Sequence, residues 1–355
     1  MLRDELLRRF PRLSSAPADA YVVGGAIRDL LLGVDPADVD VACFNPAAAA
    51  NAIGGRVVRL GTEDHLSAWR VIDGEHVYDF AEMLDHDIDT DLRRREFTIN
   101  AMAVRLRDGE LLDPHGGRAD LDRCCVRMVL PENFDDDPLR GLKAVRMAVK
   151  LRFELDTPTM LAIRPRAQLI NRIAAERVTY ELSIIFTCGT FREAVKYLHA
   201  TALDDPLFGR ELDPSAFYAD DVTLAGAYAL LVSQPKPYAK RWRWSADLLR
   251  EVTALRGLVD RARSGDAVSL KLALFDAGQP VGRQLPAVLR VLGISEPVEM
   301  PDFSLRVLLT GDEIAAIRGI TEGPELGRLK RALLQAQVRG EVRDREEAVR
   351  FVGSA

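Results

Sequence analysis

The hydrophobic pattern of the chain changes near Pro138, and this change constrains the fold more than any other feature. Up to that point, short β-type runs alternate with glycine turns. Beyond it, apolar residues recur every three or four positions and β-type alternation nearly disappears. The pattern predicts an α+β fold, in which a head of about 130 residues with strands and helices precedes a long helical body.

Local signals predict the elements of both parts. Strands are predicted at residues 21–23, 39–44, 57–60, 68–72, 76–80, 98–105 and 110–112. Asp73-Gly74 and Asp108-Gly109 predict hairpin turns, and a helix over 26–32 is predicted to end at Gly33. In the body, turns are predicted at 204–206, 233–237, 293–301 and 323–324.

A glycine pair at a strand-to-helix turn is the first candidate site. Gly24 and Gly25 let a ligand approach the backbone closely, and amides at the start of a helix attract phosphate. Arg28 adds a cation with several hydrogen-bond donors. Many such turns contain two glycines for steric reasons, so this motif alone does not identify a phosphate site.

Carboxylates follow in the next strand. Asp38 and Asp40 are two positions apart, so their side chains share one face while Val39 and Val41 face inward. This is either a solvated strand edge or a site for a cation, and Mg²⁺ prefers such oxygen ligands. Asp79, in a later strand, is a candidate third carboxylate. Three carboxylates beside a phosphate cradle indicate phosphoryl or nucleotidyl transfer.

Five motifs follow one another between residues 21 and 185. They are Gly24-Gly25-x-x-Arg28-Asp29 with Asp38-x-Asp40, the Arg-Arg-Glu-Phe-Thr-Ile-Asn-Ala string within 91–103, Leu112-Asp-Pro-His-Gly-Gly117, Asp136-Asp137-Pro-Leu-Arg140, and Glu176-Arg177-x-x-x-Glu181. Their order resembles the class II tRNA nucleotidyltransferase and bacterial poly(A) polymerase family. The resemblance implies a polymerase-beta-like head with a mixed sheet over 1–130, a helical neck with a base-reading motif over 131–200, and a helical body and tail over 201–355 that binds RNA.

The resemblance also implies a role for each site residue. Asp38 and Asp40 would hold two Mg²⁺ ions, one at the RNA 3′-hydroxyl and one at the nucleotide triphosphate, and Asp79 would support the activated hydroxyl. The residues implied to contact the triphosphate or the ribose are Gly24, Gly25, Arg28, Arg95 and Asn100. Glu96 stands where the family usually has Asp, and Asp136 where it usually has Glu. Both departures keep the charge but change the reach of the side chain.

The motif that ends at Arg140 is predicted to read the incoming base. If Asp137 and Arg140 share a helix face, the carboxylate accepts from an exocyclic amino group and the guanidinium donates to a ring nitrogen or carbonyl. Cytosine and adenine both present an amino group beside an acceptor, so the pair would select C or A. Alternatively, Pro138 begins the helix and Asp137 caps its amides. Glu176 and Arg177 are predicted to brace helices rather than to touch substrate.

Cations gather in two stretches although the net charge of the chain is −6. Residues 140–199 contain eleven Lys/Arg and five Asp/Glu, and residues 236–264 contain eight and three, with aromatic residues interleaved. Cations and flat rings suit RNA phosphates and bases, although Trp242 and Trp244 are equally compatible with a helix core. The predicted RNA-binding residues are Lys143, Arg146, Lys240, Arg241 and Arg243.

The resemblance implies an enzyme that adds CCA to the 3′ end of tRNA from CTP and ATP, with Mg²⁺ as its cofactor. Only ten residues, 81–90, separate Phe80 from Asp91. Members that add CCA usually carry a longer segment there, with a flexible loop implicated in the switch from C to A, and members that add only CC have it shortened. CC-only addition is therefore an alternative. A addition, poly(A) synthesis and a noncatalytic RNA-binding relative are further alternatives.

Composition argues against membrane, secreted, zinc-binding and disulfide-rich proteins. No apolar run approaches the length of a membrane span, and residues 1–12 are too charged for a signal peptide, so we expect no membrane partner. The four cysteines form no CxxC pair, so neither zinc nor a disulfide framework is expected. These observations predict a cytoplasmic protein.

Overall fold

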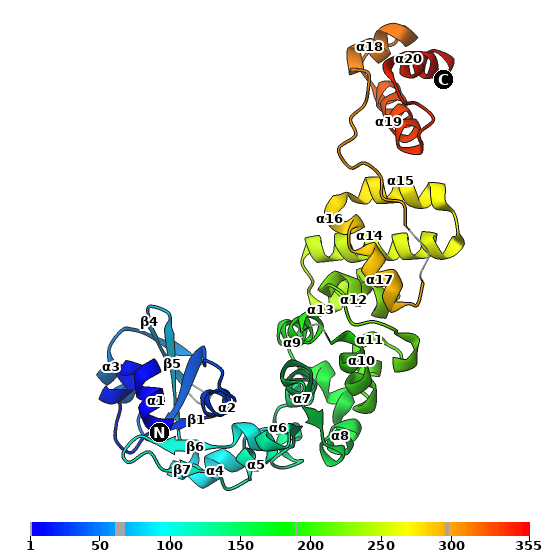
Figure 1. Cartoon of the computed structure of the whole chain (residues 1–355). Helices are drawn as coiled ribbons and strands as arrows, with labels where there is room; N and C mark the ends of the chain where they lie inside the picture. Colours follow the sequence, from blue (N-terminus) through cyan, green and yellow to red (C-terminus); the bar gives the residue numbers. More distant parts are fainter. Residues whose placement is uncertain (1, 61–67, 189, 295–297) are drawn as a thin grey trace. The chain divides into compact units, whose positions relative to one another are not determined.

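The computed structural model describes residues 2–60, 68–188, 190–294 and 298–355. They divide into two compact units, which are considered separately (Figure 1). The first unit comprises Met1–Ile185 and Glu193–Leu212, and the second comprises Phe186–Arg192 and Asp213–Ala355. The first contains a sheet and helices, whereas the described residues of the second contain helices without strands, so the chain has the predicted α+β fold.

Seven strands in the described part of the head form one mixed sheet in the order β3-β4-β5-β2-β1-β6-β7. They are β1 (Tyr21–Val23), β2 (Asp38–Cys43), β3 (Arg56–Leu60), β4 (Ala68–Asp73), β5 (His76–Glu82), β6 (Ala103–Arg105) and β7 (Leu111–Leu112). Strands β2 and β5 are parallel, and the other neighbours are antiparallel. Each predicted strand overlaps an observed strand, so the β-type alternation of the sequence located the strands of the head correctly.

The strand predicted at 98–105 is correct only at its end. Residues Thr98–Asn100 form a 3₁₀ helix, and β6 begins at Ala103. The side chains of this turn make polar contacts instead of alternating across a sheet: the Thr98 hydroxyl donates to Asp120, and the Asn100 amide donates to Glu96. The prediction failed because these bonds are not visible in a hydrophobic pattern.

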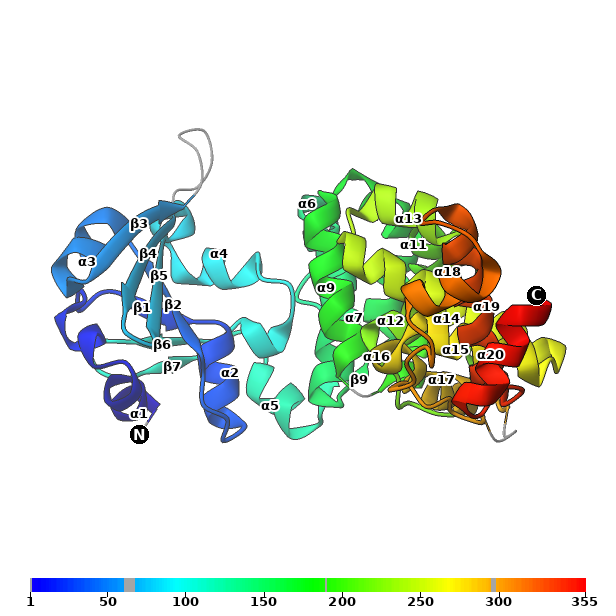
Figure 2. The same ribbon diagram turned by 90° about the horizontal axis from the view of Figure 1, so that it is seen from above.

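Helices cover both faces of the sheet. Helices α1 (Leu2–Arg9) and α3 (Pro46–Ile53) lie on one side of it, and α4 (Ile88–Arg93) lies on the other, as Figure 2 shows. Val39 and Val41 of β2 are fully buried, as predicted.

The face of β2 that carries the acids is covered only in part. Ala42, which shares this face with Asp40, packs in a core cluster with Met83 and with Leu92 of α4. Asp38 and Asp40 lie beyond this cluster and are exposed. The apolar core thus ends where the acidic positions begin, and this leaves the acids accessible to a ligand.

The first unit continues as helices. They are α2 (Gly25–Leu31), α5 (Gly117–Asp122), α6 (Asn133–Asp136), α7 (Leu139–Leu151), α8 (Thr157–Ile163), α9 (Ala175–Thr187), α10 (Phe191–Ala200) and α11 (Asp204–Phe208), of which α9 and α10 cross into the second unit. A short parallel pair, β8 (Cys125–Val126) and β9 (Glu154–Leu155), interrupts the predicted all-helical neck. The turn predicted at 204–206 is wrong, since α11 begins there; Pro206 is compatible with a first helical turn.

The second unit contains α12 (Leu224–Leu231), α13 (Pro235–Trp242), α14 (Ala246–Ser264), α15 (Ala267–Ala277), α16 (Gln279–Gly282), α17 (Leu285–Val291), α18 (Gly311–Arg318), α19 (Pro324–Arg339) and α20 (Arg345–Ser354). One core cluster joins α14, α15 and α17, and another joins α18, α19 and α20. The turns predicted at 233–237 and 323–324 fall at helix starts. Part of the turn predicted at 293–301, residues 295–297, lies outside the described residues.

Candidate active site

Three carboxylates lie on one face of the sheet, across β2 and β5. The register pairs Asp40 with Asp79 on the parallel neighbour, and Asp38 lies two residues before Asp40. Asp38 and Asp40 are exposed, whereas Asp79 is half-buried. Regular strand geometry therefore assembles the predicted acidic row.

Asp79 is bound by an arginine that sequence reasoning missed. Nε of Arg70 donates to Oδ1 of Asp79 at 2.8 Å, and Nη2 donates to Oδ2 at 2.6 Å. Arg70 lies on β4 directly opposite Asp79. The predicted hairpin could have revealed this contact, because a register that pairs Asp73 with His76 also brings Arg70 opposite Asp79.

The surroundings of Asp40 favour a cation. Burial by the surrounding protein is the main cause that raises the pKa of Asp40 to about 6. Arg95 opposes this rise, and the negative charges of Asp38, Asp79 and Glu96 add to it. Asp40 is nevertheless open to solvent, so the burial comes from protein crowded around the carboxylate rather than from an enclosed cavity. A bound cation would relieve the repulsion among these acids.

Gly24 allows Arg95 to lie against the acidic row. Its backbone has φ 77° and ψ −135°, which side-chain-bearing residues avoid. A Cβ on Gly24 would lie 2.8 Å from Nη1 of Arg95 and 3.5 Å from Oδ2 of Asp40. Arg95 is held in turn by Asp91, whose Oδ2 accepts from Nη2 at 3.2 Å. At Gly25 an added Cβ would make only ordinary contacts, so the close approach depends on Gly24.

An open pocket of about 290 Å³ includes the side chain of Arg95. Its lining residues are Glu82, Leu84, Asp91, Arg94, Arg95, Glu96 and Arg140. Arg95 and Arg140 were predicted nucleotide-binding residues, and the structure brings them together from α7 and the segment after α4. The volume approaches that of small-molecule sites, and three guanidinium groups suit a phosphate-bearing ligand.

Arg28 and Asn100, both predicted to bind nucleotide, bind each other. Nη1 of Arg28 donates to Oδ1 of Asn100 at 2.7 Å, and Nε of Arg28 donates to Asp29 at 2.8 Å. Both Arg28 and Asn100 are buried. They join α2 to the 3₁₀ helix Thr98–Asn100, and a direct contact of either residue, or of Gly25, with nucleotide stays a prediction.

The same network reaches the pocket through Glu96. Nδ2 of Asn100 donates to Oε1 of Glu96 at 2.8 Å. Burial alone would raise the pKa of Glu96, but Lys143, the backbone amide of Glu96 and the Asn100 side chain together lower it. Glu96, which departs from the usual Asp of the resembled motif, therefore lines the pocket as a negatively charged carboxylate.

The expectation that Asp137 and Arg140 share a helix face is wrong. Helix α7 begins at Leu139, and Asp137 has extended dihedral angles of −140° and 95° because the following Pro138 disfavours the helical region. The Asp137 carboxylate accepts from the Leu139 amide at 3.2 Å and from Arg177 at 3.0 Å. The alternative is met in part: Asp137 binds one amide at the helix start, that of Leu139, but Pro138 is the N-cap residue rather than the first helical one. The contact of Asp137 with a base stays a prediction.

Two residues of the last motif brace α9 against α7 and the residues just before it; this bears out the bracing role predicted for Arg177, whereas the same role for Glu176 stays a prediction. Arg177 of α9 holds Asp137, and Glu181 of the same helix forms an ion pair with Arg146 of α7, with 2.6 Å between Oε2 and Nε. The side chain of Arg146 is mostly buried, whereas Lys143, one turn earlier, is half-exposed. RNA binding by these two residues stays a prediction, and for Arg146 it would require the ion pair to open.

Comparison with known proteins identifies the family. Residues 20–85 and 72–127 match the family described as the poly A polymerase head domain, and residues 152–215 match the probable RNA and SrmB-binding site of polymerase A. The chain is 32% identical to the A-adding tRNA nucleotidyltransferase of Deinococcus radiodurans, with 98% of each protein covered. The chain belongs to the class II tRNA nucleotidyltransferase/poly(A) polymerase family.

Solved structures of CCA-adding enzymes share the fold. The Bacillus stearothermophilus enzyme in complex with CTP superposes with a TM-score of 0.76 at 25% identity, covering 99% of this chain and 97% of that one. The Thermotoga maritima enzyme complexed with tRNA has a TM-score of 0.70 at 22% identity, with 99% and 95% covered, which shows the fold alone. The chain is a nucleotidyltransferase of the CCA-adding enzyme type.

Members of this family typically use divalent metal ions, and the donor set here fits one. Asp38 and Asp40 supply adjacent carboxylates without an ion-pair partner among residues 2–60, 68–188, 190–294 and 298–355. Over the same residues, no three His, Cys, Asp or Glu side chains converge as metal ligands. Mg²⁺ needs only one or two carboxylates when phosphate oxygens complete its coordination.

The basic segment of the second unit has three exposed cations, one of which lies over a buried ring. Lys240, Arg241 and Arg243 are exposed, and the guanidinium carbon of Arg241 lies 4.4 Å from the ring centroid of Trp242. Trp242 itself is 3% exposed, and Trp244 is half-buried. The core interpretation is therefore confirmed for Trp242, whereas RNA binding by the three cations stays a prediction.

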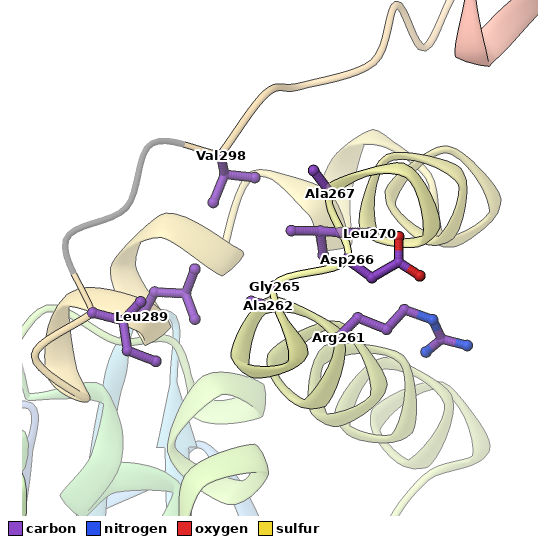
Figure 3. A pocket seen from close by; sticks show the side chains of 9 residues that line it. Arg261, Ala262, Gly265, Asp266, Ala267, Leu270, Leu289 and Val298 are labelled. Carbon is purple, nitrogen blue, oxygen red and sulfur yellow. The ribbon is translucent and has the colours of Figure 1, made fainter.

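A pocket in the second unit is too small for a nucleotide. It has a volume of about 70 Å³ and lies at the turn from α14 to α15, where Arg261, Asp266 and Leu289 are among its lining residues (Figure 3). Nucleotide sites require several times this volume. In the part of the chain that the structure describes, no helix is both long and apolar enough to cross a membrane.

Proposed function

We propose that this chain adds C, C and A to the 3′ end of tRNA from CTP and ATP, without a nucleic-acid template. The observation that carries the proposal is the acidic row of Asp38, Asp40 and Asp79, with Gly24 and Arg95 against it. The relatives named above act on tRNA or bind CTP, which supports the same classes of substrate for this chain.

In the proposed reaction, the RNA 3′-oxygen bonds to the α-phosphorus of the nucleotide and pyrophosphate leaves. Mg²⁺, when bound by Asp38 and Asp40, would stabilise the negative charge of the triphosphate as a Lewis acid. Arg95 donates to the triphosphate, and the conformation of Gly24 leaves room for phosphate oxygens at the backbone. Asp79 is the candidate acceptor for a hydrogen bond from the 3′-hydroxyl.

Arg140 is the residue best placed to select the base. Its side chain lines the pocket with Arg95, and one of its nitrogens, Nη1, donates to the Asn133 carbonyl at 3.0 Å. The other N–H groups of a guanidinium can donate to the ring nitrogen or carbonyl of cytosine or adenine. A contribution from Asp137 would require its carboxylate to leave Arg177.

CC-only addition is a second candidate, and the connection between β5 and α4 favours it. Strand β5 ends at Glu82, a 3₁₀ helix spans Leu84–His86, and α4 begins at Ile88. Asp85 and His86 both have positive φ, 49° and 54°, so the chain turns sharply here. Over the described residues 82–88, no long loop separates these elements, whereas the resemblance links the switch from C to A to such a loop.

The product pattern on three tRNA substrates tests both candidates. Purified full-length protein receives a tRNA transcript that lacks CCA, ends in CC, or carries complete CCA, with labelled CTP or ATP. We expect two C additions to the first transcript and one A addition to the second. Addition of C without A would establish the CC-only candidate. Addition of A alone, or of a long A tract to complete tRNA, would refute the proposal.

Two variants connect the activity to the site. Asp40→Ala is expected to abolish incorporation while tRNA affinity changes little, because Asp40 lies in the acidic row rather than in a basic segment. Asp122→Asn, at an exposed position of α5, removes one carboxylate outside the row and is the matched control. Full incorporation by Asp40→Ala would show that this row is not the catalytic site.

A further inference from the structure

The ion pair between Arg70 and Asp79 lies within the acidic row. The register aligns Arg70, Asp79 and Asp40 side by side on β4, β5 and β2. Both oxygens of Asp79 accept from the same guanidinium, at 2.8 and 2.6 Å. The Asp79 side chain is only 16% exposed and that of Arg70 is 40% exposed, so water weakens this pair less than it would a surface pair.

The three carboxylates of the row therefore differ in kind. Two parallel hydrogen bonds from an arginine fix the orientation of Asp79 and neutralise most of its charge. Asp38 and Asp40 have no ion-pair partner within the described residues, so their charges remain available to a metal ion. A carboxylate already committed to a guanidinium is a poorer ligand than a neighbour whose oxygens are accessible.

We infer that Arg70 is a positioning residue that keeps Asp79 out of the metal-binding set, so that Asp38 and Asp40 alone hold the metal ions. The inference rests on the proposed function, because it concerns the same site. Arg70 acts through Asp79, and together the two residues add no net charge to the row. Removing both partners should therefore affect metal affinity far less than removing either one.

A double-mutant cycle with Mn²⁺ as the probe tests this inference. Binding of Mn²⁺ to nucleotide-free, full-length protein is measured by electron paramagnetic resonance. Arg70→Gln frees Asp79 and adds one net negative charge, so we expect Mn²⁺ affinity to tighten about tenfold. Asp79→Asn leaves Arg70 uncompensated and should weaken affinity about tenfold. The double variant should bind within about threefold of the original protein.

The double variant gives the decisive comparison. If Asp79 were a metal ligand, the double variant would bind Mn²⁺ at least tenfold more weakly than the original protein, and the inference would be overturned. Unchanged or weaker binding by Arg70→Gln would overturn it as well. If Arg70→Gln alone does not fold, the double variant still decides, since Gln and Asn can hydrogen-bond to each other.

Two further variants separate charge and position. Arg70→Lys keeps the cation next to Asp79 and should bind Mn²⁺ as the original protein does. Arg56→Gln removes the same charge from β3, one strand further away at about 15 Å from Asp40, where salt screens the interaction. Mn²⁺ affinity should not change in this control, and a tenfold change would show that the effect of Arg70 is not local.

Asp40→Ala distinguishes failure of the inference from failure of the proposed function. This variant should lose both Mn²⁺ binding and nucleotide incorporation. If it retains incorporation, the proposed catalytic site is wrong. If it is inactive while the Arg70→Gln/Asp79→Asn variant loses Mn²⁺ affinity, only the inference about Arg70 fails.

Discussion

Gly24→Ala should impair catalysis far more than it impairs folding. The new Cβ would lie 2.8 Å from Nη1 of Arg95, whereas ordinary contact begins at 3.4 Å, so the guanidinium must move by about 0.6 Å, the difference between the two. Asp91 restrains that movement. Since a displacement of about 1 Å in a positioning group costs roughly 100-fold, we expect kcat/KM to fall about 10- to 100-fold.

The backbone cost of the same change is separable. A side chain at φ 77° and ψ −135° costs about 1–3 kcal/mol, which lowers Tm by roughly 2–10 °C in a unit of this size. Gly33→Ala is the matched control, because Gly33 also has positive φ, 72°, but nothing lies within 4 Å of an added Cβ. This control should lose about 1 kcal/mol of stability and retain full activity.

Two measurements test the argument. Incorporation of labelled CTP into tRNA gives kcat/KM, and thermal melting gives the change in stability for both variants. If Gly24→Ala lowers Tm but keeps kcat/KM within threefold of the original protein, Arg95 does not act at the acidic row. If Gly33→Ala loses as much activity as Gly24→Ala, backbone strain rather than the displaced guanidinium is the cause.

Three further outcomes are expected. Asn100→Ala removes the acceptor of buried Arg28 and should lower the free energy of unfolding by about 2–4 kcal/mol in urea titrations; a loss below about 0.5 kcal/mol would contradict the network. Iodoacetamide at pH 8 should label exposed Cys124 well before Cys43, since burial raises the pKa of Cys43 to about 11 and its thiol stays protonated; equal labelling rates by mass spectrometry would disprove this. Lys240→Ala should weaken tRNA binding and reduce the slope of log affinity against log salt by about 0.7–1, and an unchanged slope would exclude a phosphate contact.

Strand periodicity was sufficient to predict the acidic row. A strand has only two faces, so the alternation of Asp38, Val39 and Asp40 determines which side chains are buried and which are exposed. The parallel pairing that brings Asp79 beside Asp40 depends on a long crossover, however, and no local pattern specifies its register. The row was therefore predictable as a set of residues, but its spacing was not.

Side-chain partners were harder to predict than faces. The hairpin register could have identified Arg70 as the neighbour of Asp79. The register does not say that both carboxylate oxygens accept from the same guanidinium, because that depends on how the two side chains are oriented. The helix face that Asp137 was expected to share with Arg140 does not exist, because Pro138 does not allow the helix to begin so early. The contact of Arg28 with Asn100 could not be predicted from local patterns, because the two residues are 72 positions apart in the sequence.

The isoelectric point of the chain is near 5.6, and the distribution of its charges explains why this value is compatible with a nucleic-acid substrate. Near the site, Asp79 is neutralised by Arg70, whereas Asp38 and Asp40 keep their charge beside a pocket lined by arginines such as Arg140. A nucleotide triphosphate with its metal ions carries both signs of charge. Its metal ions can bind the carboxylates while its phosphates bind the arginines. A site of this kind requires acids and cations within one pocket, and their sum in the whole chain carries no information about it.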